Sequence, residues 1–72
     1  MQGHVTHIIA IESDGNAHRV FLDAQLLSTY LTLDRARFAA MLVARDINLA
    51  VKKLNFELNE LGHLVATVHK AI

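Results

Sequence analysis

The sequence predicts an α+β fold: an amino-terminal β-hairpin, a short connecting helix and a long carboxyl-terminal helix that mediates a homodimer. A β-branched segment near the amino terminus runs into an Asp-Gly pair, which is typical of a hairpin. From residue 40 onward apolar residues return every three or four positions, and the chain has no proline to stop a helix. We expect a single domain over residues 1–72, divided into the hairpin (1–23), the short helix (24–32) and a long helix or helical hairpin (33–72).

The hairpin is predicted from residues 4–12, which are rich in β-branched types and lead into Ser-Asp-Gly-Asn at residues 13–16. A second strand should follow over residues 18–23. Both faces of this ribbon carry apolar side chains, so it must pack on helices and can also join the ribbon of a second subunit. With Asp14 and Gly15 at the centre of the turn, the expected pairs are Ile11 with His18, Ile9 with Val20, and His7 with Leu22, while Ile8 and Phe21 pair on the other face.

Two helix starts are predicted after the hairpin. Asp23 can cap a short helix over residues 24–31, because its side-chain oxygen can accept an amide hydrogen from the first turn. Asp34 can cap the next helix, and Leu33 and Phe38 flank it at the spacing of a hydrophobic staple. These features place the long helix directly after the short one.

The long helix is predicted from a seam of apolar residues that resembles a coiled coil, and we expect this seam to form the dimer or partner interface. Four other apolar residues fall nearly opposite the seam on a helical wheel: Phe38, Leu42, Leu49 and Phe56. The first half of the helix therefore has two apolar faces, one for the chain's own hairpin and one for a second subunit. The seam consists of Ala40, Val43, Ile47, Ala50, Leu54, Leu58, Leu61, Val65, Val68 and Ile72.

A helical hairpin is the alternative for residues 33–72. Lys52 and Lys53 would suit the carboxyl end of one helix, and Asn55 could cap the next. The seam stays in phase across this point, which a tight turn would not require. Gly62 is only a mild defect within a helix, of about 1 kcal/mol. We favour one long helix, with two helices left open.

Composition narrows the range of partners. Lysine plus arginine and aspartate plus glutamate number seven each, so no net charge attracts nucleic acid or an anionic membrane. A chain of 72 residues that is 53% hydrophobic favours oligomerisation as a source of stability, since without cysteine it has no disulfide. No apolar run approaches the roughly 20 residues of a membrane span, so we expect a cytoplasmic protein that contacts no membrane.

The histidines do not predict a metal site. His4 and His7 are three residues apart on a strand, and His63 and His69 are six apart on a helix, so both pairs diverge. We therefore expect no metal and no cofactor. If His7 and His18 share one face of the ribbon near a subunit contact, oligomerisation would respond to pH below about 6.5.

Candidate nucleophiles are few. Ser13 lies in a turn and Ser28 in the short helix, and neither has the context of a nucleophile elbow. There is no glycine-rich phosphate loop either. We expect no enzyme activity.

A second interpretation starts from residues 24–43, whose apolar spacing resembles the packed interior of a helix-turn-helix. The resemblance implies contacts to DNA from Thr32, Arg35 and Arg37 near the start of the second helix. Thr32 stands where such motifs usually have glycine, and the zero net charge disfavours nucleic acid. A dimeric DNA-binding transcriptional regulator is therefore our alternative.

The function we predict is that of a small, non-enzymatic interaction module that binds a partner protein and modulates or inhibits it. An inhibitor, an anti-activator or an adaptor would fit. The chain combines a surplus of apolar residues with no catalytic set and no basic surface. In size and composition alone it also resembles short regulators encoded by phages and plasmids.

Overall fold

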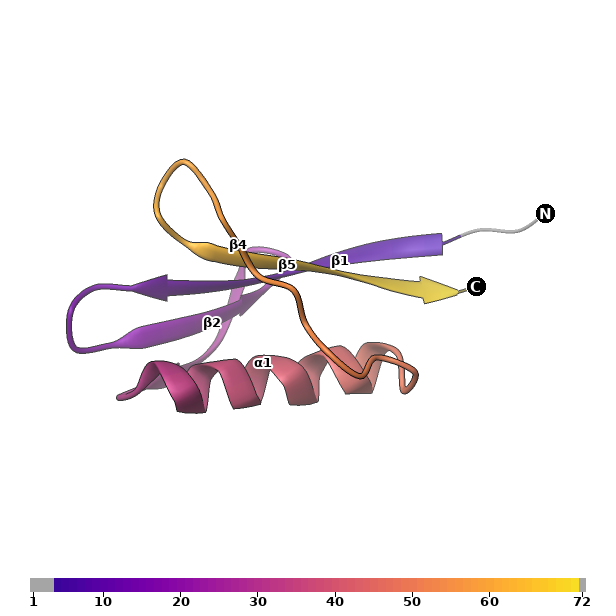
Figure 1. Cartoon of the computed structure of the whole chain (residues 1–72), viewed down its shortest axis with the longest axis horizontal. Coiled ribbons are helices and arrows are strands. Elements are labelled where there is room, and N and C mark those ends of the chain that lie inside the picture. Colours follow the sequence, from indigo (N-terminus) through magenta and orange to yellow (C-terminus); the bar gives the residue numbers. More distant parts are fainter. Residues whose placement is uncertain (1–3, 72) are drawn as a thin grey trace.

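A computed structural model describes residues 4–71 of the chain as one antiparallel sheet covered on one face by a single helix (Figure 1). The strand order in the sheet is β3-β2-β1-β5-β4. Among the described residues, no helix has the length and apolar character needed to cross a membrane. The elements are β1 (His4–Ser13), β2 (His18–Leu22), β3 (Gln25–Tyr30), α1 (Leu33–Ile47), β4 (Glu57–Leu58) and β5 (Leu64–Ala71).

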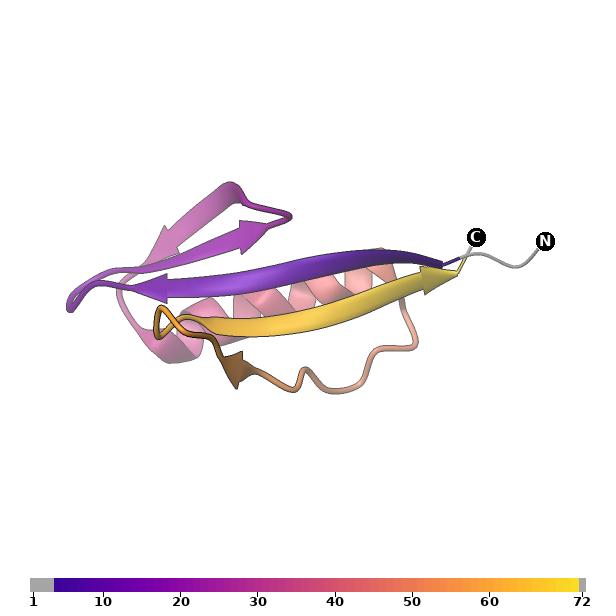
Figure 2. The same cartoon turned by 90° about the horizontal axis from the view of Figure 1, so that it is seen from above.

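β1 is the central strand, with β2 on one side and β5 on the other. Its length of 10 residues and its β-branched composition suit it to this position. Figure 2 shows β1 and β5 running side by side along the length of the molecule. The register pairs Ile9 with Leu22 and Ala66, Ala10 with Phe21 and Val65, and Ile11 with Val20 and Leu64.

The core lies between the sheet and α1. Ile9, Ile11 and Val20 project from the sheet and are at most 1% exposed. Burying each of these side chains contributes about 1.5–3 kcal/mol. The facing side of α1 presents three alanines with no exposed surface, and these small side chains let the helix backbone approach the sheet closely. They are Ala36, Ala40 and Ala44.

The expected hairpin is present, but its register is shifted by two residues. The connection spans residues 14–17, so that Ser13 pairs with His18 and Ile11 pairs with Val20 rather than with His18. An ion pair of 2.6 Å between Asp14 and a guanidinium nitrogen of Arg19 closes the longer loop. A shift of two residues keeps every side chain on its expected face.

The prediction of a short helix over residues 24–31 is wrong, because this segment is strand β3. Asp23 and Ala24 have φ angles of 50° and 69° and form a tight turn from β2 into β3. Two successive positive φ angles are typical of a type I′ turn, which joins adjacent antiparallel strands. Asp23 therefore closes a hairpin and caps no helix.

The predicted start of the next helix is also corrected. The cap is Thr32, whose hydroxyl accepts a hydrogen bond of 3.2 Å from the backbone N–H of Arg35. Asp34 lies within the first turn of α1. Leu33 packs against the core while Phe38 is 66% exposed, so these two side chains do not form the expected staple.

The long helix and its helical-hairpin alternative are both wrong, because α1 ends at Ile47 and β4 and β5 follow. Asn48 ends the helix with an extended backbone, at φ −150° and ψ 107°. Its side-chain oxygen accepts from the N–H of Ala50, and its side-chain amide donates to the carbonyl of His69, both at 3.0 Å. Asparagine thus stops the helix by a local turn and by a bond to β5.

The apolar seam is divided among several elements and forms no coiled coil. Its first members, on α1, pack against the chain's own sheet. Val65 and Val68 lie on opposite faces of β5, as residues three apart on a strand must. Ala40, Val43 and Ile47 are on α1, Ala50 and Leu54 in the following segment, Leu58 on β4 and Leu61 in the β4–β5 turn, while Ile72 lies outside the described residues.

Replacing Gly62 by alanine should destabilise the protein by about 1 kcal/mol, because Gly62 has a φ of +80° in the β4–β5 turn. A helical Gly62 would instead be stabilised by alanine by a similar amount. Urea denaturation of the two proteins measures the difference. Unchanged or increased stability would contradict this turn.

Ala40→Leu should destabilise the protein by about 1–3 kcal/mol, because the larger side chain cannot fit between α1 and the sheet. Thermal and urea denaturation provide the measurement. Ala50→Leu adds the same atoms at an exposed position after the helix and serves as the control. Equal stability of the two variants would mean that the alanine face of α1 is not packed as described.

Candidate functional site

The face of the sheet opposite α1 is open and its floor is apolar. Along β1, side chains alternate between the two faces, so Ile8 and Ala10 point away from the helix while Ile9 and Ile11 point toward it. Ile8 is 48% exposed. Phe21 of β2 is the cross-strand neighbour of Ala10 on this open face and extends the apolar floor.

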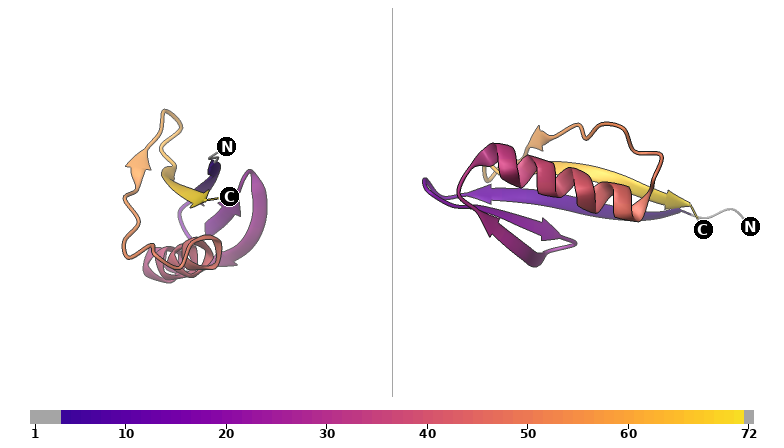
Figure 3. Two further views of the ribbon diagram at one scale, coloured as in Figure 1. Left: turned by 90° about the vertical axis from the view of Figure 1, so that its right-hand side faces the viewer. Right: turned by 90° about the horizontal axis from the view of Figure 1, so that it is seen from below.

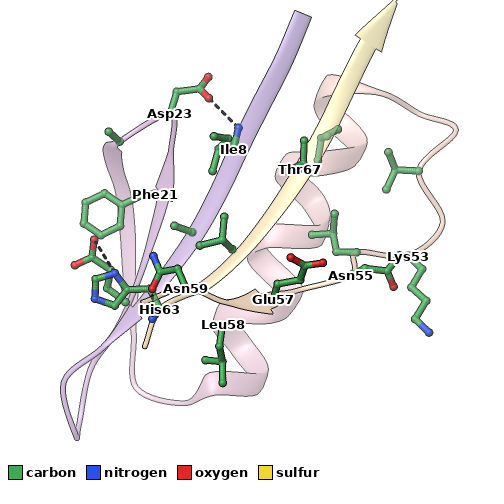
Figure 4. A pocket seen from close by; sticks show the side chains of 17 residues that line it. Ile8, Phe21, Asp23, Lys53, Asn55, Glu57, Leu58, Asn59, His63 and Thr67 are labelled. Carbon is green, nitrogen blue, oxygen red and sulfur yellow. Dashed lines mark hydrogen bonds and ion pairs between the residues drawn. The ribbon is translucent and has the colours of Figure 1, made fainter. Parts of the chain in front are cut away.

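Two walls turn the open face into a groove of about 980 Å³ (Figure 4). One wall is the segment that leaves α1 and runs along one side of the sheet to β4, as the left view of Figure 3 shows. The other wall is the turn between β2 and β3. The floor includes Ile8, Ala10, Phe21, Val65 and Thr67, and the walls include Asp23 and Ala24 on one side and Val51, Lys53, Leu54, Asn55, Glu57 and Leu58 on the other.

The turn wall is held to β1 by Asp23. Its backbone N–H donates to the carbonyl of Ile8 at 2.8 Å, and its carboxylate accepts from the N–H of Ile8 at 2.9 Å. The second carboxylate oxygen lies 2.6 Å from Nδ1 of His7. The N–H of Ile8, followed by His7, lowers the pKa of the Asp23 carboxyl below its usual 3.8.

The opposite end of the groove is organised by Asn59 in the β4–β5 turn. Its side-chain oxygen accepts hydrogen bonds from the N–H groups of Leu61 and His63, at 3.0 and 2.9 Å. Its backbone N–H donates to the carbonyl of His63 at 2.9 Å. These bonds fix the turn that returns the chain to β5, and they place His63 at the end of the groove (Figure 4).

The charges around the groove are mostly acidic. Three carboxylates, those of Glu12, Asp23 and Glu57, lie among the lining residues, against one amine, that of Lys53. The imidazole of His63 lies 3.9 Å from Glu12 and adds a positive charge only when it is protonated. A neutral or basic ligand therefore suits this rim better than an acidic one.

A serine–histidine pair lies outside the groove. Ser13 Oγ and His18 Nδ1 are 2.6 Å apart at the hairpin end of the sheet. Within residues 4–71, no carboxylate forms an ion pair with His18, and neither residue lines the groove. A hydrolytic triad would need an orienting acid and a substrate pocket beside the serine.

The histidines are dispersed. The described residues contain no group of three or more histidine, aspartate or glutamate side chains placed to hold a metal ion. His7 and His18 share the face that carries Ile9 and Ile11, but each bonds a different neighbour, Asp23 and Ser13 respectively. These contacts place the two imidazoles in separate environments.

The residues expected to contact DNA lie together near the start of α1 but in another structural context. A helix-turn-helix needs two helices, and α1 is the only helix among residues 4–71. Thr32 uses its hydroxyl to cap this helix. The guanidinium of Arg37 lies 5.4 Å from the ring centre of Phe56, and Arg35 is exposed.

Four of the seam residues do meet at one place, although not as a helical stripe. Leu54, Leu58, Val65 and Val68 are among the residues that line the groove, Val68 from the strand face that is directed toward α1. The sequence did not identify Ile8 and Phe21 as site residues. The feature of the sequence that could have identified them is the apolar character of both hairpin faces, because a single helix can cover only one of the two faces.

Comparisons with protein-family models, with curated proteins and with solved structures gave no match. The geometry of the groove is therefore the basis for assigning a function.

Asp23→Asn should lower the melting temperature at pH 6, because asparagine keeps the turn conformation but loses the carboxylate that contacts His7 and Ile8. The native pKa of Asp23 is below its unfolded value, so its contribution is fully present above pH 3.8 and is lost as the pH falls through the native pKa. Melting curves between pH 6 and pH 2.5 should therefore converge at the acidic end.

Glu60→Gln in the β4–β5 turn is the control and should leave the melting temperature unchanged across the same range. A wild-type advantage over Asp23→Asn that persists undiminished at pH 2.5 would contradict the assignment.

Proposed function

We propose that the protein is a non-enzymatic interaction module, which binds an apolar segment of a partner protein in the groove and thereby modulates that partner. The observation that supports this most is the exposed apolar floor. Ile8 is 48% exposed at the centre of the sheet, in a walled groove rather than on a flat surface. Exposed apolar surface of this kind is typical of interaction sites.

The size of the groove favours a protein segment as its ligand. Its volume of about 980 Å³ is at the upper end of the range for small-molecule pockets, roughly 300–1,000 Å³. Strands form its floor and an extended segment forms one wall, so it can take the apolar side chains that lie on one face of a bound strand or helix.

The charges define the partner further. Because carboxylates outnumber amines around the groove, the bound segment should be neutral or basic. Binding of this segment in the groove would prevent the partner protein from using the segment for its other interactions. The same arrangement would serve an inhibitor, an anti-activator or an adaptor, all of which act by binding alone.

Ile8→Glu should weaken partner binding strongly without unfolding the chain, because Ile8 faces the open side of the sheet. Val5→Glu is a matched control: Val5 is also a β-branched residue on β1, is 40% exposed, and lies on the opposite face. A partner that co-purifies with the wild-type chain would be identified, produced separately and titrated against all three proteins. We expect at least a tenfold loss of affinity for Ile8→Glu and a change of less than twofold for Val5→Glu.

Equal affinity of Ile8→Glu and wild type would contradict binding in the groove. Recovery of a nucleic acid or of a small molecule in place of a protein would contradict the proposed class of function. Circular dichroism of each variant establishes that the comparison is made between folded chains.

A further inference from the structure

The outer face of α1, directed away from the sheet, exposes a row of large apolar side chains. Phe38 and Leu42 are 66% and 50% exposed on the helix. Leu31 and Leu49, just beyond its two ends, are 83% and 89% exposed. The right view of Figure 3 shows this side of α1 with no other element of the chain over it.

This row is symmetric about Ala40 in the sequence. Phe38 and Leu42 lie at equal distances before and after Ala40, and so do Leu31 and Leu49. If two copies of α1 packed in opposite directions with their centres at Ala40, Phe38 of each would meet Leu42 of the other.

The charges that flank the row have the same symmetry. Asp34 and Arg35 lie at the start of α1, and Arg45 and Asp46 lie near its end. All four are exposed, and within the described part of the chain none of them forms an ion pair. With 3.6 residues per turn, Arg35 and Asp46 fall on one flank of the apolar row, while Asp34 and Arg45 fall on the other.

We propose that a second copy of this chain binds the outer face of α1, so that the two helices pack antiparallel with their centres near Ala40. Arg35 then meets the partner's Asp46 on one flank, and Asp34 meets the partner's Arg45 on the other. Leu31 lies beside the partner's Leu49 at each end. Every exposed apolar and charged group named above acquires a complementary group.

Self-complementarity of this kind is what a two-fold interface requires, since the same surface must serve both subunits. A domain of 72 residues is also of a size that often depends on assembly for stability. A parallel pair could satisfy the charges as well, with Arg35 beside the partner's Asp34. We favour the antiparallel pair because it brings the positive end of each helix dipole next to the negative end of the other.

This interface is independent of the proposed function. α1 and the groove lie on opposite faces of the sheet, so that in the dimer both grooves remain open. Ile8→Glu should accordingly leave the dimer intact, and the failure of one proposal would not affect the other.

Sedimentation equilibrium of the purified chain tests the assembly. The wild-type chain should dimerise, and Phe38→Ala should weaken the dimer at least tenfold, because Phe38 is the largest side chain of the row. Its exposure in the single chain means that the substitution does not disturb the core. A wild-type chain that stays monomeric up to about millimolar concentration, or a Phe38→Ala dimer as stable as the wild-type dimer, would overturn the proposal.

Charge reversal tests the antiparallel arrangement. Arg35→Glu and Asp46→Arg should each weaken the homodimer about tenfold, because each places like charges opposite one another at two symmetric positions. A mixture of the two variants should form heterodimers with wild-type affinity, since both contacts then join opposite charges. In a parallel pair the mixture would retain two repulsive contacts.

Lys53→Glu reverses a charge on the groove side and should leave dimerisation unchanged. Failure of the mixed variants to recover affinity, or an equal effect of Lys53→Glu, would overturn the antiparallel arrangement.

Discussion

One helix must cover a five-stranded sheet whose central strand is apolar on both faces, and the rest of the structure follows from this constraint. α1 can occupy only one face, where Ile9 and Ile11 are buried against it. Ile8 on the other face is flanked by the two walls of the groove and remains 48% exposed. Alternate residues of β1 therefore contribute to the core and to the candidate site, and the site is apolar because β1 carries apolar side chains on both faces.

Local signals predicted the hairpin, whereas the long helix failed for a reason that single-sequence periodicity cannot remove. Leu61, Val65 and Val68 satisfy a spacing of three and four residues, yet residues 64–68, three of which are β-branched, suit a strand equally well. The helix ends at Asn48, and one of the two side-chain hydrogen bonds of Asn48 is to the carbonyl of His69, which is distant in sequence. Gly62, with Asn59 three residues before it, was the local sequence feature that indicated a turn at this place.

The short connection after β2 was misread for a different reason. Asp23 is a good helix cap and an equally good turn residue, and the following Ala24 favours helix by intrinsic propensity. In the structure Ala24 adopts a φ of 69°, which alanine disfavours. The hydrogen bonds between Asp23 and Ile8 stabilise this turn, so the groove wall depends on a tertiary contact that overrides local preference. The site was therefore harder to predict than the hairpin that carries it.

The distribution of side-chain size around α1 argues that its outer face also has a structural purpose. An amphipathic helix usually directs its large apolar side chains toward the core and its polar ones toward solvent. Here the fully buried positions are alanines, while Phe38 and Leu42 point outward. Close approach to the sheet requires the small residues inside, but it requires nothing of the outer face. Phe38 and Leu42 leave half or more of their surface exposed in the single chain, and burial of that surface in an assembly is the further stabilisation they can provide.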